Sequence, residues 1–202
     1  GNILGAALPM LVAQILSLLY NIVDRIYIAR IPSVGTTALG AVGLCFPIIV
    51  IITAFSNLFG SGGAPLFSIN RGKGNIKKAE VIMNTSFSML CICGVALMVI
   101  GMLFASSILV LFGASEEGLS YAYPYMMIYL IGTVPSMIAT GMNPFINAQG
   151  YATSGMLSVT IGAVANLILD PLFIFGLNLG IKGAAIATII SCLLYTSPSP
   201  RD

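Results

Sequence analysis

Residues 155–177 read GMLSVTIGAVANLILDPLFIFGL, an apolar stretch that contains one acid, Asp170. The stretch is longer than the roughly 18 residues that a membrane-spanning helix needs. A carboxylate inside a bilayer costs at least about 2.5 kcal/mol, so such residues usually face a cavity and usually have a function. A second acid, Asp24, lies near the end of the apolar run Leu4–Ala29. The sequence therefore predicts transmembrane helices that carry two functional carboxylates.

The composition excludes a soluble domain. The chain has 202 residues, of which 58% are hydrophobic and only 7% are charged, whereas soluble domains carry about 25% charged residues. The sequence contains no His, which excludes His-based acid–base chemistry and zinc catalysis. The net charge of +2 gives no indication of nucleic-acid binding. We expect an all-α, polytopic membrane protein.

Hydrophobic runs and breaking residues predict a six-helix transmembrane bundle. The second helix is expected to break at Pro47 and at residues 60–65, and the fourth contains three prolines. The sixth helix is expected to stop after Ser191. The predicted helices are Leu4–Ala29, Leu39–Ile69, Val81–Phe112, Ser120–Asn147, Gly155–Leu177 and a last one from Gly183.

Loop charges predict the orientation. Four cations lie between residues 71 and 78, after the second helix, and Glu116 and Glu117 follow the third. Because loops rich in Lys and Arg stay in the cytoplasm, we expect a cytoplasmic N-terminus in a multi-pass protein of the cytoplasmic membrane.

This topology predicts that polar residues of different helices meet. Helical rise puts a set of side chains at a similar depth in the outer half of the membrane: Asp24, Tyr125, Asp170 and Thr188. Residues four apart share a helix face, so Asn166 lies beside Asp170 and Tyr20 beside Asp24. These groups are expected to converge on one pocket.

Paired carboxylates in such a pocket suit ion coupling. Repulsion and poor solvation favour a proton on at least one of them, and their oxygens, with the Asn166 carbonyl and the Thr188 hydroxyl, also suit Na⁺. The alternative is structural: Asp170 holds the helix around Pro171, and Asp24 offsets Arg25. Pro9 cannot donate to the Gly5 carbonyl, so it is either a static kink or a hinge that couples ion binding to bending.

The chain divides into residues 1–191, a six-helix lobe, and residues 192–202. The tail Cys192–Asp202 breaks the apolar pattern and is similar to a translated sequencing adapter, so we expect it not to be native. The chain is expected to be a piece of a longer protein.

Several motifs together resemble the N-terminal lobe of multidrug and toxic compound extrusion (MATE) transporters. They are LYNIVD at 19–24, NRGKGN at 70–75, NAQG at 147–150, ANLILDP at 165–171 and GIKGAA at 180–185. The resemblance implies one lobe of a twelve-helix, two-lobe transporter, not an enzyme. It also implies a coupling ion, H⁺ or Na⁺, no cofactor, and export of drug-like, cationic organic molecules.

The resemblance also implies residue roles. Asp24, Asn166, Asp170 and Thr188 match the cation site, which is where Na⁺ would bind. Supporting tyrosines match Tyr20 and Tyr125, the bending proline matches Pro9, and a cavity-lining amide matches Asn143. The partners implied are the lipid bilayer, a small organic substrate and the missing C-terminal lobe, so the 202-residue chain is expected to be inactive alone.

Two other functions are consistent with membrane aspartates. A flippase for lipid-linked oligosaccharides or polysaccharides shares the expected fold. A cationic cavity would favour that function, whereas the membrane-embedded charges here are mostly acidic and favour cationic substrates. An intramembrane aspartyl protease uses two aspartates, but its Tyr-Asp and Gly-x-Gly-Asp patterns are absent around Asp24 and Asp170.

Overall fold

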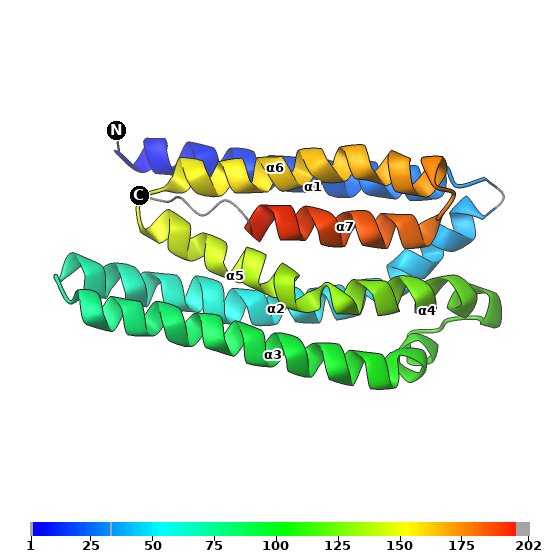
Figure 1. Ribbon diagram of the computed structural model, residues 1–202, viewed down its shortest axis with the longest axis horizontal. Coiled ribbons are helices and arrows are strands. Elements are labelled where there is room, and N and C mark those ends of the chain that lie inside the picture. Colours follow the sequence, from blue (N-terminus) through cyan, green and yellow to red (C-terminus); the bar gives the residue numbers. More distant parts are fainter. Residues whose placement is uncertain (1, 33, 197–202) are drawn as a thin grey trace.

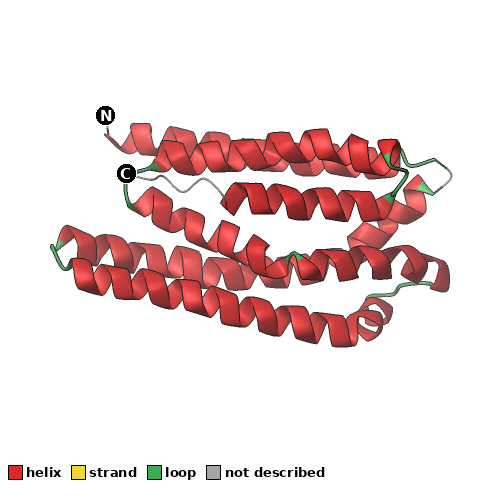
Figure 2. Cartoon of the chain, viewed as in Figure 1, coloured by secondary structure: helices red, strands yellow, loops and turns green. Residues whose placement is uncertain are grey.

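The computed structural model describes residues 2–32 and 34–196, and these form helices joined by short turns (Figure 2). Within these ranges no residue is in a β-strand. The expected all-α architecture is confirmed. The described helices are α1 (Asn2–Ala29), α2 (Gly35–Gly72), α3 (Ile76–Leu111), α4 (Glu116–Ile131), α5 (Thr133–Ala148), α6 (Ala152–Pro171), the π-helix η1 (Leu172–Gly176) and α7 (Ile181–Thr196).

The helices run up and down in a single bundle (Figure 1). The N-terminus lies at the same end as the turn between α2 and α3, and α1 lies alongside α6. Four of the described helices are long and apolar enough to cross a membrane, and the bent pair α4 and α5 makes a fifth candidate. The apolar part of α7, Ile181–Leu194, is shorter.

The predicted breaks in the second helix are wrong. α2 continues through Pro47 and Pro65 from Gly35 to Gly72, although its course changes direction in Figure 1. Proline removes one backbone donor, and in a membrane helix neighbouring helices can compensate for that loss. Two glycines of this segment allow close approach of other helices: a Cβ at Gly60 would collide with the carbonyl of Gly141 on α5, and one at Gly63 would collide with the Ser86 and Phe145 side chains.

The predicted fourth helix is in fact two helices. α4 ends at Ile131 and α5 begins at Thr133, with a bend of 56° between them. Pro135 explains the position of the break, because a proline ring clashes with the carbonyl four residues earlier, which belongs to Ile131. Gly132 at the break receives the Ile189 side chain of α7. A broken fourth helix is why the structure has more helices than the six predicted.

Other predicted bounds shift by several residues. α3 begins at Ile76, where the Asn75 side chain accepts a hydrogen bond from the Lys78 amide at 3.2 Å, a helix cap that the prediction of Val81 overlooked. α4 begins at Glu116 rather than Ser120, because the Ser115 hydroxyl caps it. α7 begins at Ile181 and remains helical to Thr196, beyond the predicted end at Ser191. Residues 197–202 of the predicted tail lie outside the described residues.

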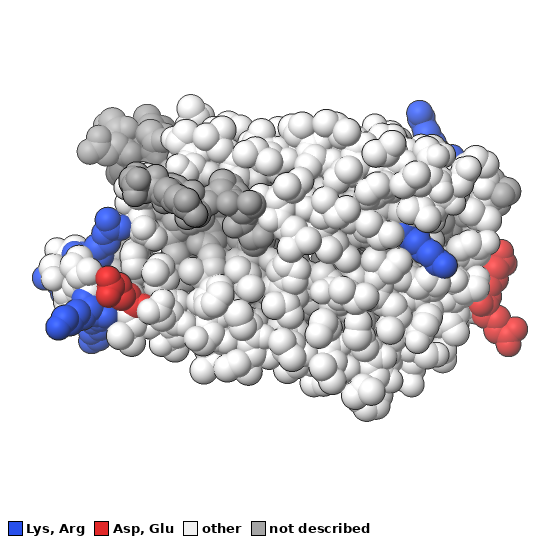
Figure 3. Space-filling model, viewed as in Figure 1, with Lys and Arg blue, Asp and Glu red and all other residues white. Residues whose placement is uncertain are grey.

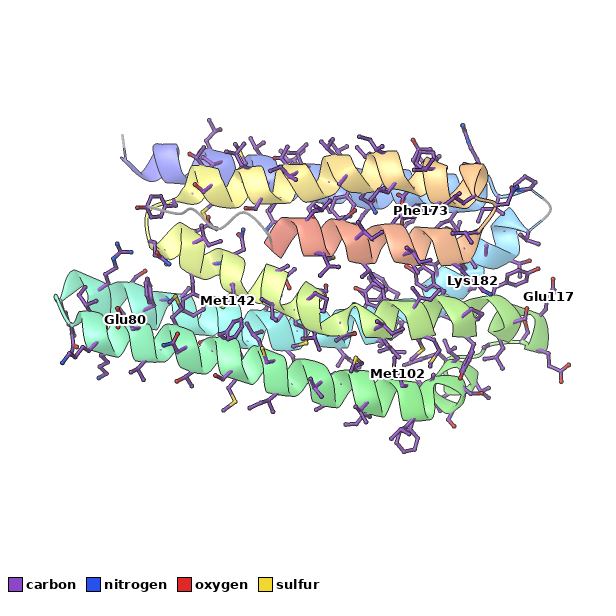
Figure 4. All side chains as sticks on the ribbon, viewed as in Figure 1. Glu80, Met102, Glu117, Met142, Phe173 and Lys182 are labelled. Atoms are coloured by element: carbon purple, nitrogen blue, oxygen red, sulfur yellow. The ribbon has the colours of Figure 1, made fainter. Side chains whose placement is uncertain are left out.

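On the face drawn in Figure 3, charged side chains gather at the two ends of the bundle and none is visible across its middle, where the helices are apolar. Glu80 of α3 lies near one end, whereas Glu117 and Lys182 lie near the other (Figure 4). An apolar middle between charged ends matches the profile of a bilayer.

Candidate functional site

The site is built around two carboxylates from neighbouring helices. Asp24 on α1 and Asp170 on α6 lie close enough for their charges to interact, and α1 packs along α6. Asp170 has 0% of its surface exposed. The predicted encounter of the two acids is therefore present in the fold.

The predicted pairing of Asn166 with Asp170 is also present. The Asn166 side-chain amide donates to Oδ1 of Asp170 at 3.3 Å, and Asn166 is almost fully buried. The turn that follows is irregular: Pro171 ends α6, and the π-helix η1 continues from Leu172. π-Helical turns are rare and often occur at functional sites.

Acceptor oxygens at this site lack partners. Among the described residues, Oδ1 of Asp24, Oδ1 of Asn166 and Oδ2 of Asp170 are buried without a hydrogen bond. An unsatisfied buried acceptor costs about 1–3 kcal/mol. A proton or a hard cation placed among these oxygens would remove that cost, and oxygen donors of this kind fit Na⁺. The described residues contain no cluster of three or more His, Cys, Asp or Glu side chains suited to a metal ion.

Tyr125 and Tyr20 approach the carboxylates from two sides. Tyr125 is buried on α4, stacks on Tyr129 with ring centroids 6.3 Å apart, and lies close enough to Asp24 and Asp170 to interact with their charges. Tyr20, one turn before Asp24, also interacts with that carboxyl group and lines a cavity.

Apolar contacts follow the carboxylates along both chain segments. The rings of Tyr27 on α1 and Phe175 on η1 pack in a T-shaped arrangement, with centroids 6.4 Å apart. Ile28 and Ile174, next to them in sequence, are buried. An apolar cluster thus lies about one turn beyond the two acids.

A cavity of about 760 Å³ lies next to the site, between α1, α2, α5, α6 and α7. Asn166 and Tyr20 line it and so connect the cavity to the carboxylates. Thr188 also lines the cavity, but its hydroxyl donates to the Ala184 carbonyl of its own helix at 3.0 Å. Asp24, Asp170 and Tyr125 are not among its lining residues. The single pocket that the sequence predicted is therefore divided into a carboxyl site and an adjoining cavity. Within the described part of the chain, no Asp, Glu, Lys or Arg lines the cavity.

Asn143 lies in the cavity wall, as predicted, but away from the carboxylates. Its side-chain amide donates to the Gly155 carbonyl at 3.3 Å, and its Oδ1 accepts from the Asn147 amide at 3.1 Å. The first bond joins α5 to α6, the second lies within α5, and together they hold the Asn143 amide in place.

Pro9 is contained within α1, which stays helical from Asn2 to Ala29. A helix that continues through Pro9 is compatible with a static kink and with a hinge.

The sequence reasoning missed most of the polar cavity wall. On α2 the wall includes Thr53, Asn57 and Ser61, which are spaced by four residues, and on α1 it includes Gln14 and Ser17. This spacing is a recognisable signal, because residues three or four apart share one helix face. Polar residues repeated on one face of an apolar helix indicate a lined cavity.

The fold and site define a multi-pass α-helical membrane protein with a half-buried and a fully buried acid beside a cavity. The sequence profile of the MatE family matches residues 9–172, more than half of the chain. The chain belongs to this family.

Curated relatives agree with this membership. The chain is 31% identical over 201 residues to the "FAD transporter" of Shewanella oneidensis, covering 98% of this chain and 44% of that protein. It is 31% identical over 185 residues to the "Multidrug export protein MepA" of Staphylococcus haemolyticus, covering 92% and 40%. The chain thus spans about two fifths of the length of these relatives.

Solved structures share the fold. An outward-facing multidrug resistance MATE family transporter of the MOP superfamily superposes with a TM-score of 0.89 at 27% identity, covering 96% of this chain and 42% of that one. A MOP superfamily transporter from Pyrococcus furiosus gives the same values. Coverage of this size is consistent with one lobe of a two-lobe transporter.

Proposed function

We propose that the full-length protein containing this chain is an ion-coupled antiporter that exports drug-like organic molecules. The observation that carries the proposal is the carboxyl pair of half-buried Asp24 and fully buried Asp170, with unsatisfied oxygens, beside a cavity large enough for an organic solute. In this proposal, H⁺ or Na⁺ binds at Asp24, Asn166, Asp170 and Thr188, and the organic solute occupies the cavity.

Ion binding can be coupled to solute transport because the carboxyl pair and the cavity adjoin each other. Asn166 belongs to both, because it donates to Asp170 and lines the cavity. An ion that binds the carboxylates changes the charge next to the Asn166 amide. It can also shift the position of α1 relative to α6, because each helix contributes one carboxylate. A ligand shifts such an equilibrium only by its differential affinity for the two states, and paired acids provide that difference for a cation.

The whole transporter requires parts beyond this chain. We propose that a second lobe closes the cavity and that the N-terminus is cytoplasmic, as the loop cations between residues 71 and 78 favour. We expect the 202-residue chain to be inactive alone. None of the described residues that line the cavity is charged. A preference for cationic solutes would therefore arise from the negative electrostatic potential of Asp24 and Asp170.

The test is transport by the full-length protein in everted membrane vesicles. Ethidium accumulation inside the vesicles, which corresponds to export from the cell, is measured by fluorescence under an imposed pH gradient, an imposed Na⁺ gradient, or neither. Acceleration by one gradient supports antiport and identifies the ion. Efflux that responds to neither gradient would contradict coupling and favour a flippase.

A further inference from the structure

A cluster of cations at the turn between α2 and α3 belongs neither to the carboxyl site nor to the cavity wall. Residues 71–80 contain four cations and one acid, Glu80, so their net charge is +3. All four cations are exposed, and no ion pair within the described residues joins any of them to a carboxylate. They are Arg71, Lys73, Lys77 and Lys78. Their charge is therefore available to a partner outside the chain.

Backbone hydrogen bonds fix the shape of this turn. The Lys73 amide donates to the Ile69 carbonyl at 3.1 Å, and the Asn75 amide donates to the Asn70 carbonyl at 2.9 Å. Gly74 has a φ of 76°, in the left-handed region, and the Asn75 side chain caps α3. The cations thus project from two helix ends that a short turn holds together at one end of the bundle (Figure 3).

Two of the cations lie one helical turn from exposed apolar side chains. Lys73 follows Ile69 by four residues at the end of α2, so the two share a helix face. Lys77 precedes Val81 by four residues at the start of α3 and shares a face with it in the same way. Ile69 is 52% exposed and Val81 is 62% exposed. Because both helices run from this turn into the apolar middle of the bundle, each pair has its charge on the water side and its apolar group on the membrane side.

The other two cations lie on faces that pack inside the bundle. The Arg71 guanidinium lies over the Phe67 ring, 6.0 Å from its centroid, and Phe67 is buried against Phe145 of α5. Lys78 precedes Ile82 by four residues, and Ile82 packs against the same apolar cluster. Arg71 and Lys78 therefore carry the same charge as the two lysines above without an exposed apolar neighbour one turn away.

A cation next to an exposed apolar side chain fits a membrane lipid with an anionic headgroup. A lysine ammonium has three donors for headgroup oxygens, and an apolar side chain one turn deeper can contact the acyl chain. A soluble polyanion would engage the charge but leave the apolar groups without a partner. Clusters of four to eight Lys and Arg next to a membrane helix are typical of anionic-lipid binding.

We propose that the turn between α2 and α3 binds anionic phospholipids. Lys73 and Lys77 contact the headgroups. Ile69 and Val81 contact the acyl chains. This surface lies outside the carboxyl site and the cavity, so the inference goes beyond the proposed function and does not depend on it.

Quenching by brominated lipids measures binding at this surface. The chain contains no Trp, so Leu66→Trp places a reporter three residues before Ile69, at a position that is 55% exposed. Any Trp in the rest of the full-length protein is first replaced. The protein is reconstituted in phosphatidylcholine bilayers that contain either dibrominated phosphatidylglycerol or dibrominated phosphatidylcholine, and quenching gives the relative association constant of each lipid.

We expect phosphatidylglycerol to associate more strongly than phosphatidylcholine at this reporter. One lysine near an anionic surface corresponds to a factor of about five, and the preference should fall at high salt because salt screens exposed charges. The control reporter is Leu111→Trp, an exposed position at the other end of α3, where we expect little preference.

Paired variants test which cations are responsible. Lys73→Gln combined with Lys77→Gln should reduce the preference by about fivefold or more. The matched control combines Arg71→Gln with Lys78→Gln, which removes the same charge from the same turn, and it should retain most of the preference.

Each other outcome would overturn the inference. Equal association of the two lipids at Leu66→Trp, or a preference that the lysine variants leave unchanged, would show that the turn does not bind anionic lipids. An equal loss in both double variants would show that net charge alone attracts the lipid, without the surface described here. A preference of the same size at Leu111→Trp would show that the attraction is not specific to this turn. None of these results alters the gradient-driven transport that tests the proposed function.

Discussion

The amide of Asn166 donates to the carboxylate of Asp170 one helical turn away, at 3.3 Å, and both side chains are shielded from solvent. Asn166 also lines the cavity. One side chain thus contacts both the buried acid and the space where we propose that the solute binds. The effects of substitutions at the acids are therefore expected to appear in solute transport.

Asp170→Asn and Asp24→Asn in the full-length protein should abolish gradient-driven efflux. An amide keeps the size of the side chain but can neither take up a proton nor carry the charge that attracts Na⁺. Ethidium accumulation inside everted vesicles is the measurement, and Glu117→Gln, at an exposed position of α4, is the control. Normal expression and a monodisperse elution profile exclude misfolding, and full efflux by both acid variants would disprove the site.

Gly60→Val should destabilise the bundle. A side chain there would collide with the Gly141 backbone of α5, and overpacking of this kind costs about 1–3 kcal/mol. The measurement is the thermal unfolding midpoint of the detergent-solubilised full-length protein. Gly62→Val is the matched control, since no described atom lies within 4 Å of a Cβ placed there. Equal midpoints for the two variants would show that α2 and α5 are not in close contact.

Pro9→Ala should slow efflux if the proline is a hinge. Alanine restores the backbone donor to the Gly5 carbonyl and removes the ring clash, which makes bending of α1 more costly. We expect slower ethidium efflux with unchanged affinity for the probe. Pro47→Ala on α2 is the control, because it also replaces a proline within a helix. Unchanged efflux in Pro9→Ala would identify Pro9 as a static kink.

The orientation can be tested by cysteine labelling in intact cells. With the four native cysteines replaced, a membrane-impermeant maleimide should label Glu116→Cys, at the start of α4, and leave Lys73→Cys, after α2, unlabelled. Lysed cells should show labelling at both positions. The opposite pattern in intact cells would place the N-terminus outside.

Local patterns predicted much of the candidate site. Helical spacing of four predicted the contact of Asn166 with Asp170, and counting residues from the membrane surface predicted that Asp24 would reach the same depth. The bounds of the helices were less accurate. The break after Ile131 follows from Pro135, yet Pro47 and Pro65 cause no break in α2, because the effect of a proline depends on what packs around it.

The sequence alone determined that the chain spans a membrane, which side chains share a helix face, and where charge accumulates along the chain. These properties depend on hydrophobicity and on helical repeat, and both are local. The tertiary structure alone decided that Asp24 and Asp170 lie close enough for their charges to interact, and that Thr53, Thr140 and Ser191 line the adjoining cavity, where none of the described lining residues is charged. These features depend on how helices distant in sequence pack together, since an interhelical contact requires both partners to be placed.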